Sequence, residues 1–253
     1  MLSIVYEDAD LLVVDKPAGL VVHPAHGQSG NTLLDLLAAR GSTEQQDDEL
    51  VGLKPVHRLD RDTSGLLVVA RSPRAHRYLA YQWQHRLVDK RYLALVHGHP
   101  HPDTARIDLP LGRDPDNRHR VIPRSGGKPA RTRYETIRHH AGFTLLDVRP
   151  ETGRTHQIRA HLTAVGHPIA GDGLYGSTAV PPGLTRQFLH AHSLTIRLPS
   201  TRQLRTFAAP LPPELAEVLA ELPATGAGRD AGGVGPQAAA RDAAPCTACP
   251  APT

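Results

Sequence analysis

Short apolar runs separated by turn residues begin the chain. Residues 2–24, LSIVYEDADLLVVDKPAGLVVHP, alternate β-branched runs with the turn sequences EDAD and KPAG. Proline at a turn corner followed by glycine is typical of tight turns, so this region predicts two or three strands. Residues 31–40 space their leucines for one helix face, with Asn31 or Thr32 as the N-cap and Gly41 as the stop. A short helix is therefore expected next.

The middle of the chain alternates predicted strands with a predicted helix. GLLVVARS at 65–72 has the unbroken apolar run of a buried strand, and Ser72-Pro73 has the pattern of a helix start. The apolar stripe of this helix, at a spacing of four, consists of Ala75, Leu79, Trp83 and Leu87. KRYLALVHG at 90–98 predicts another strand. Residues 99–129 show little periodicity, and because a long excursion of this kind usually has a function, we expect it near substrate.

The remaining pattern completes a mixed fold. Residues 130–150 alternate on either side of HHAGF, which predicts an antiparallel hairpin. Residues 155–166 predict a helix capped by Thr155, with Ile158, Leu162 and Val165 on one face. Two strands, at 186–199 and 202–210, and a helix at 212–222 follow. The fold class is therefore α+β, a mixed, mainly antiparallel sheet with flanking helices, in one domain over 1–223. Residues 224–253 lack an apolar pattern and are expected to be a disordered tail rich in Ala, Gly and Pro.

Composition and charge add a preference for planar anionic partners. The chain has 253 residues, is 40% hydrophobic and carries a net charge of +4, so it can bury a sizeable core. Only four of its 29 basic residues are lysines, and arginine pairs well with phosphates and base edges. Between Lys54 and Arg91, nine basic residues face three acidic ones, which concentrates positive potential around Asp60. With no leader and no apolar run of about 18 residues, we expect a cytoplasmic protein outside the membrane.

Three alternative chemistries find little support. Asp60-Arg61-Asp62-Thr63 is close to the DxDx(T/V) motif of aspartate-dependent phosphotransferases, but KPVHRL precedes it instead of a long apolar strand, and Ser64 stands where Thr or Val is usual. The 16 histidines include no HExxH pattern and are interpreted as solvated or capping residues. Cys246 and Cys249 form a lone CxxC in the tail, without further ligands. We therefore expect no metal and no cofactor.

Three distant motifs together resemble the pseudouridine synthases of the RluA family. They are HRLDRDTSG at 57–65, KRYLALVHG at 90–98 and GRTHQIRAHL at 153–162, with FLHAHSL at 188–194 beyond them. The resemblance extends from VVDKPAGLVVHP at 13–24 to GHPIAGDGLYG at 166–176. It implies the pseudouridine synthase catalytic fold and the isomerisation of uridine in RNA to 5-ribosyluracil. It also implies that no energy donor is required, and the sequence shows no P-loop and no dinucleotide fingerprint.

The resemblance assigns roles to five residues. It implies that Asp60 is the catalytic aspartate and that Arg159 pairs with it. Tyr92 matches the tyrosine that stacks on the target uracil. Arg58 resembles the arginine that enters the RNA stack in place of the uridine, and Leu189 matches an apolar residue that walls the uracil pocket. The residues alone support less, namely a pocket for a flat ligand with an anionic backbone, such as an extruded nucleotide.

Partners follow from the same comparison. The chain resembles the shorter family members, which lack an S4-type RNA-binding module, so we expect the catalytic domain itself to bind the RNA backbone. Charge alone suggests the contacts Arg61, Arg74, Arg86, Arg113, Arg118, Arg120 and Arg124. The substrate is expected to be a uridine in rRNA or tRNA, and the loop sequences and motif spacing resemble the rRNA-type members somewhat more. The protein is expected to be a monomer. A catalytically silent RNA-binding or ribosome-assembly factor is the alternative, but it would not need Asp60, Tyr92 and Arg159 all intact.

Overall fold

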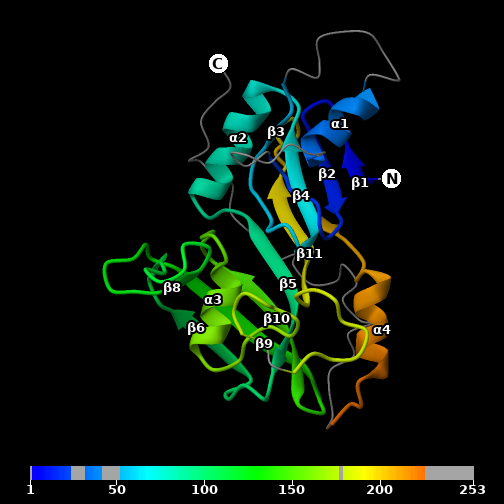
Figure 1. Cartoon of the computed structure of the whole chain (residues 1–253). Coiled ribbons are helices and arrows are strands. Elements are labelled where there is room, and N and C mark those ends of the chain that lie inside the picture. The colour runs from blue at the N-terminus through cyan, green and yellow to red at the C-terminus, as the bar shows by residue number, and fades with distance from the viewer. Residues whose placement is uncertain (1, 24–31, 42–51, 177–178, 226–253) are drawn as a thin grey trace.

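One long mixed sheet organises the described part of the chain, which comprises residues 2–23, 32–41, 52–176 and 179–225 of a computed structural model (Figure 1). Its strands are β1 (Ser3–Glu7), β2 (Leu11–Lys16), β3 (Lys54–Pro55), β4 (Ser64–Ala70), β5 (Asp89–His97), β6 (Thr104–Asp108), β9 (Arg131–His140), β10 (Phe143–Pro150), β11 (Leu189–Arg197) and β12 (Leu204–Ala208). A separate two-stranded sheet pairs β7 (Leu111–Arg113) with β8 (Val121–Pro123).

The strand order places β11 at the junction of the two halves of the sheet. The order is β1-β2-β4-β11-β5-β10-β9-β6, with β3 paired to β4 and β12 to β11. Among the described strands, only β4 and β11 pair in parallel, and the other pairs are antiparallel. The predicted α+β class with a mixed, mainly antiparallel sheet is confirmed.

Two helices cover opposite faces of the N-terminal half of the sheet. Helix α1 (Leu33–Gly41) packs its residues Leu33 and Leu37 against Leu67 of β4. Helix α2 (Pro73–Gln84) packs Ala75 and Leu79 against Leu66, the residue before Leu67 in the same strand. Neighbouring strand residues point to opposite faces, so β4 is buried on both sides. Helices α3 (Gln157–Ala164) and α4 (Pro213–Glu221) pack on the other half, against β5 and β10 (Figure 1).

The cap sequences account for the starts of α1 and α2. The Thr32 hydroxyl accepts a hydrogen bond from the Asp35 backbone N–H at 3.3 Å, and the Asp35 carboxylate accepts one from the Thr32 N–H at 2.8 Å. This reciprocal pair is a capping box, so Thr32 serves as the N-cap. Ser72 Oγ accepts from the Ala75 N–H at 3.1 Å in front of α2, as the Ser72-Pro73 pair predicts.

Two helix predictions were wrong at their ends. Helix α2 stops at Gln84, and Leu87, assigned to the apolar stripe, is 41% exposed beyond it. Helix α3 begins at Gln157 and not behind Thr155; its N-cap is His156, in a left-handed conformation with φ 53°. The Gln157 side-chain oxygen accepts hydrogen bonds from Thr152 Oγ1 at 2.6 Å and the Arg154 N–H at 3.0 Å. The side chain of the first helical residue therefore holds the preceding turn and moves the cap to His156. Val165, predicted on the apolar face, is exposed after the last turn.

The chain end is described only as far as Thr225. Ala224 forms a β-bridge with His140, and the Thr225 N–H donates to the His139 carbonyl at 3.0 Å. Apart from these two residues, the predicted tail, with Cys246 and Cys249, lies outside the described residues. Within the described ranges, no helix combines the length and apolar character needed to cross a membrane.

Gly65 allows β4 to approach β11 unusually closely. It has a φ of +113° and pairs with Ala191 in the parallel register. A Cβ at this position would lie 2.3 Å from the Ala191 carbonyl oxygen, and L side chains rarely adopt this backbone conformation. The glycine thus sets the distance between the 57–63 loop, which leads into β4, and Leu189 at the start of β11.

We predict that Gly65→Ala lowers the free energy of unfolding by at least about 3 kcal/mol, because it adds a backbone clash to an unfavourable φ. The control is Gly142→Ala, which has a φ of +75° but nothing within 4 Å of the added Cβ. It should cost only about 1 to 2 kcal/mol, the cost of the left-handed conformation. Urea unfolding followed by circular dichroism measures both, and equal losses would contradict the steric argument.

Candidate active site

Arg159 joins two carboxylates in the centre of the molecule. Its Nε and Nη2 donate to Oδ2 and Oδ1 of Asp172 at 2.7 and 2.9 Å, and its Nη1 donates to Asp60 Oδ2 at 3.0 Å. Burial disfavours the charge of the guanidinium, but the hydrogen bonds and charges of Asp172 and Asp60 outweigh this and raise the pKa of Arg159. The cation is thus permanent, and its fork of donors orients the Asp60 carboxylate.

These three residues come from separate segments. Asp60 lies in the loop between β3 and β4, Arg159 in the first turn of α3, and Asp172 in the loop before β11. The Asp172 carboxylate also accepts from the backbone N–H groups of Leu174 at 3.1 Å and Tyr175 at 3.3 Å. Asp172 is 1% exposed. These two backbone N–H groups fix its carboxylate, which in turn fixes Arg159.

His156 and Tyr175 form the wall beside this ion pair. The Tyr175 hydroxyl accepts from the Val121 N–H and donates to the Val121 carbonyl, both at 2.9 Å, and it lies 3.3 Å from His156 Nδ1. His156 Nε2 is 3.8 Å from Asp60 Oδ2, too far for a hydrogen bond. Burial lowers the pKa of His156.

A buried lysine supports the loop that carries Asp60. Lys16 Nζ donates to three backbone carbonyls, those of Pro17 at 2.8 Å, Leu20 at 2.9 Å and Arg61 at 2.9 Å. Lys16 is fully buried, and burial lowers its pKa to about 8. All three ammonium donors are therefore used to join the KPAG turn to the residue after Asp60.

Arg186 and Gln187 hold the other side of the same loop. Arg186 donates to the Asp62 carbonyl at 3.1 Å and to Ser64 Oγ at 3.0 Å, and it pairs with Glu214 of α4 at 2.9 Å. Gln187 Nε2 donates to the Thr63 hydroxyl at 2.7 Å. The loop is thus fixed by side chains from β2 and from the segment before β11, and Glu214 of α4 pairs with one of them, Arg186.

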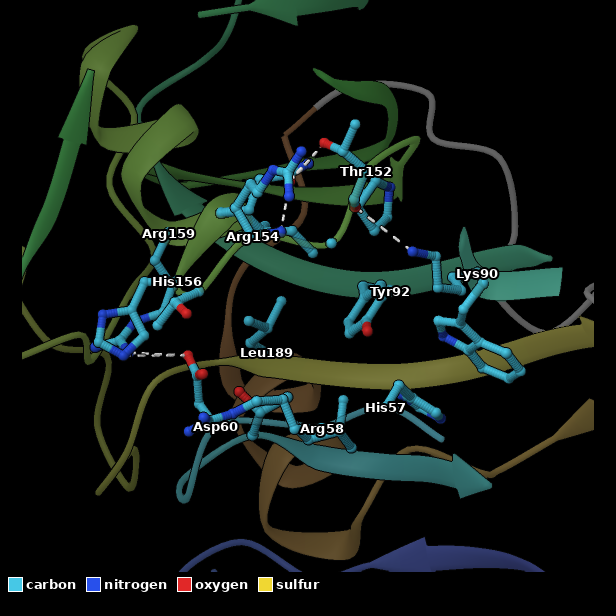
Figure 2. Close-up of a pocket in the computed structure, with 18 of the residues that line it drawn as sticks. His57, Arg58, Asp60, Lys90, Tyr92, Thr152, Arg154, His156, Arg159 and Leu189 are labelled. Carbon is cyan, nitrogen blue, oxygen red and sulfur yellow. Dashed lines mark hydrogen bonds and ion pairs between the residues drawn. The ribbon is translucent and has the colours of Figure 1, made fainter. Parts of the chain in front are cut away.

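Asp60 lines two neighbouring pockets, which are called here the first and the second arm of the site. The first arm, of about 280 Å³, runs along Tyr92, Leu189 and Lys90 (Figure 2). The second arm, of about 890 Å³, extends toward the loops at 171–174 and 185–187. Both arms are lined by Arg58, Leu59, Asp60, His156 and Arg159. A ligand bound there can place one part in each arm with its centre at Asp60.

The first arm has apolar and aromatic walls. Tyr92 comes from β5, and burial, together with the charge of Asp60, raises the pKa of its phenol, so the ring is neutral. Leu189 begins β11 and is 3% exposed. His57 stacks on Trp83 with ring centroids 4.7 Å apart, and burial lowers the pKa of His57 to about 3. The arm can therefore accept a flat ring.

Four of the predicted RNA-contacting arginines lie together on one hairpin. Arg113, Arg118, Arg120 and Arg124 belong to the β7–β8 hairpin, which packs against α3. Arg120 pairs with Asp114 at 3.7 Å and lies 5.3 Å from the centre of the Tyr175 ring.

The other predicted cations are spread over the N-terminal half. Arg74 is exposed in α2, and Arg86 lies two residues after the end of that helix at Gln84. Arg61 is exposed and pairs with Asp62 at 3.1 Å. Arg58 is exposed and lines both arms. Of the seven predicted contacts, only Arg61 is among the residues that line the two arms.

The carboxylates of the phosphotransferase-like motif have different partners. Asp60 binds Arg159, whereas Asp62 pairs with Arg61. In the described ranges, no group of three or more His, Cys, Asp or Glu side chains is arranged to hold a metal ion.

Sequence reasoning did not single out several residues that shape the site. Asp172 and Lys16 stand in GDGLYG and KPAG, which have the composition of turns. The signal that could have found them is chemical: a carboxylate and an ammonium, each beside a turn in a segment of otherwise apolar residues, require buried partners.

Comparisons with known proteins agree with this geometry. Residues 10–164 match the family described as RNA pseudouridylate synthase. The ribosomal large subunit pseudouridine synthase D of Nitrosomonas europaea is 45% identical over 225 residues, which cover 86% of this chain and 64% of that protein. An uncharacterized RNA pseudouridine synthase of Chloroflexus aurantiacus is 49% identical over 212 residues, which cover 82% of this chain and 65% of that one. The chain thus spans slightly less than two thirds of the length of these two relatives.

A solved structure has the same fold. Human RNA Pseudouridylate Synthase Domain Containing 1 superposes with a TM-score of 0.71 at 29% sequence identity, and the match covers 89% of each chain.

We predict that Asp172→Asn lowers the free energy of unfolding by about 3 kcal/mol, because it leaves the buried Arg159 with one carboxylate fewer. The control is Asp108→Asn, in which the carboxylate pairs with Arg131 at 3.1 Å but is 52% exposed. Its effect should stay within about 0.5 kcal/mol. Chemical denaturation measures both variants; an Asp172→Asn protein as stable as the control would show that Arg159 does not depend on Asp172.

Proposed function

The chain belongs to the RNA pseudouridylate synthase family, and from this premise we propose that it isomerises uridine in RNA to pseudouridine with Asp60 as the catalytic carboxylate. The observation that carries the proposal is the placement of Asp60. It lines both arms and is oriented by the buried Arg159.

The reaction is an intramolecular rearrangement of one nucleoside. The bond between uracil N1 and ribose C1′ breaks, the ring turns, and C5 forms the new bond to C1′; C5 loses its hydrogen as a proton and N1 gains one. No oxidant or group donor is consumed. Asp60 could attack the sugar, add to the ring or remove a ribose proton, and each role requires an ionised carboxylate. The ion pair with Arg159 holds the Asp60 carboxylate in position.

The first arm suits the uracil ring. Tyr92 offers a neutral aromatic face and Leu189 an apolar wall. Base stacking on an aromatic side chain is worth about 1 to 3 kcal/mol, and it holds a ring without fixing its rotation in the plane. We propose that Arg58, which is exposed and lines both arms, occupies the gap that an extruded uridine leaves in the RNA stack.

We propose that the substrate RNA is either rRNA or tRNA. One relative is named a ribosomal large subunit pseudouridine synthase, so a transcript of large-subunit ribosomal RNA is the first substrate to test. We propose that the protein is a monomer. We place the enzyme in the cytoplasm, without a metal or organic cofactor.

We predict tritium release from a large-subunit ribosomal RNA transcript labelled with [5-³H]uridine, in the presence of EDTA. Asp60→Asn should reduce the rate by about a thousandfold or more, because it removes the ionised carboxylate. Asp103→Asn, at a carboxylate with a 70% exposed side chain that pairs with His139, is the control and should keep the wild-type rate. If the wild type released nothing from rRNA or tRNA, free or in ribosomal particles, a silent RNA-binding factor would explain the fold better.

We predict that the exposed hairpin arginines contribute to RNA binding through phosphate contacts. Changing Arg113, Arg118 and Arg124 together to Gln should lower affinity and reduce the slope of log K against log salt by about 2 to 3, since each contact contributes about 0.7 to 0.9. Arg120 is left intact because it pairs with Asp114. Filter binding between low and moderate salt measures the slope. Arg205→Gln on β12 is the control, and an equal change there would refute a local contact surface.

A further inference from the structure

Lys90 lies on the pocket side of β5, two residues before Tyr92. Residues two apart on a strand share a face and are about 6.7 Å apart, and both side chains line the first arm. The motif KRYLALVHG was singled out for Tyr92, whereas its first residue has no role in the function proposed above.

The ammonium of Lys90 has N–H donors that are free to bind a ligand. Its hydrogen bond to the Thr152 carbonyl is 3.5 Å long, and no carboxylate in the described ranges forms an ion pair with it. Its neighbours are the stacked pair His57 and Trp83, while Asp89 is exposed on the strand beside it. Burial lowers the pKa of Lys90 to about 8. A partly buried cation of this kind lacks a strong partner in the free protein.

The first arm has a defined order. Figure 2 shows Tyr92 between Asp60 on one side and Lys90 on the other. A ring lying on Tyr92 with its sugar at Asp60 therefore has its far edge toward Lys90.

The geometry of uracil gives this far edge a constant chemistry. In uridine the sugar is on N1, and the ring atom opposite N1 is C4, which carries the carbonyl oxygen O4. In pseudouridine the sugar is on C5, and the atom opposite C5 is C2, which carries the carbonyl oxygen O2. Both orientations thus present an acceptor at the same place. Cytidine presents the amino group of C4 there, a donor that an ammonium repels.

We propose that Lys90 determines specificity in the first arm by donating a hydrogen bond to O4 of the target uridine and, after the ring has turned, to O2 of the product. The contact selects uracil over cytosine and places a positive charge where the detached ring carries negative charge. This inference rests on the proposed function and deepens it, because it names the group that recognises the base.

The test combines a residue change with an atom change. The target uridine is first mapped on the large-subunit transcript by sequencing of pseudouridine. That uridine is then replaced in the full-length RNA, by splinted ligation, with 4-deoxyuridine, which lacks O4. Dissociation constants are measured for both RNAs with Lys90 and with Lys90→Met, all in an Asp60→Ala background so that no turnover occurs. Lys54→Met, at an exposed lysine outside the pocket, is the matched control.

The expected result is a coupling between Lys90 and O4. Loss of O4 should weaken binding by about tenfold or more when Lys90 is present, as for a hydrogen bond to a charged group, and by less than about twofold in Lys90→Met. In the Lys54→Met protein, loss of O4 should weaken RNA binding as much as it does when Lys54 is present. Equal effects of removing O4 with and without Lys90 would overturn the proposal. Lys90 would then only support the Thr152 segment, and Lys90→Met would weaken the binding of both RNAs to the same extent.

The two proposals fail in different ways. If the wild type modifies no uridine, the proposed function fails at the mapping step. If a uridine is mapped but the double cycle shows no coupling, the function stands and the role of Lys90 alone is rejected.

Discussion

The shared guanidinium of Arg159 is the interaction on which the site depends. A guanidinium presents its donors in one rigid plane, and Asp172 occupies two of them while Asp60 takes a third. A charge this deeply buried is unfavourable unless it is paired. Because Asp172 is itself held by two backbone N–H groups, the orientation passes from the backbone to Asp172, then to Arg159 and finally to Asp60. The Asp60 carboxylate is thus positioned from outside its own loop.

The sheet brings these segments together at β11. This strand pairs with β4 in parallel and with β5 in antiparallel, so it joins the loop of Asp60 to the strand of Tyr92. The close approach at Gly65 and the three carbonyl contacts of Lys16 then leave the loop little freedom. A rigid scaffold carrying functional loops at a strand junction is a common way to build a site. Among the described strands, the parallel pair is the exception, and its register begins at Ser64, four residues after Asp60.

The elements could be predicted from the sequence because their periods are local, whereas several contacts could not. The buried run of β4 and the alternation around HHAGF depend on neighbours two residues away. The start of α3 was mispredicted because the Gln157 side chain competes with Thr155 for control of the turn. Asp172 and Lys16 looked like turn residues, since their partners are 13 and 45 positions distant. Charge counting likewise could not distinguish Arg120, paired with Asp114, from the exposed Arg118. The role of Asp60 came from a family resemblance and not from any pattern.

The distribution of polarity in the first arm fits a ring that must turn within it. Dispersion and stacking contacts, such as those of Tyr92 and Leu189, depend weakly on rotation about the ring normal, whereas hydrogen bonds depend strongly on direction. A pocket with polar groups around the whole ring would favour the starting orientation and oppose the turn. In this arm Tyr92 lies between the charged groups Asp60 and Lys90, and Leu189 adds an apolar wall. Contacts from Asp60 and Lys90 would then lie along the axis that uridine and pseudouridine share, so these two groups could serve both orientations of the ring.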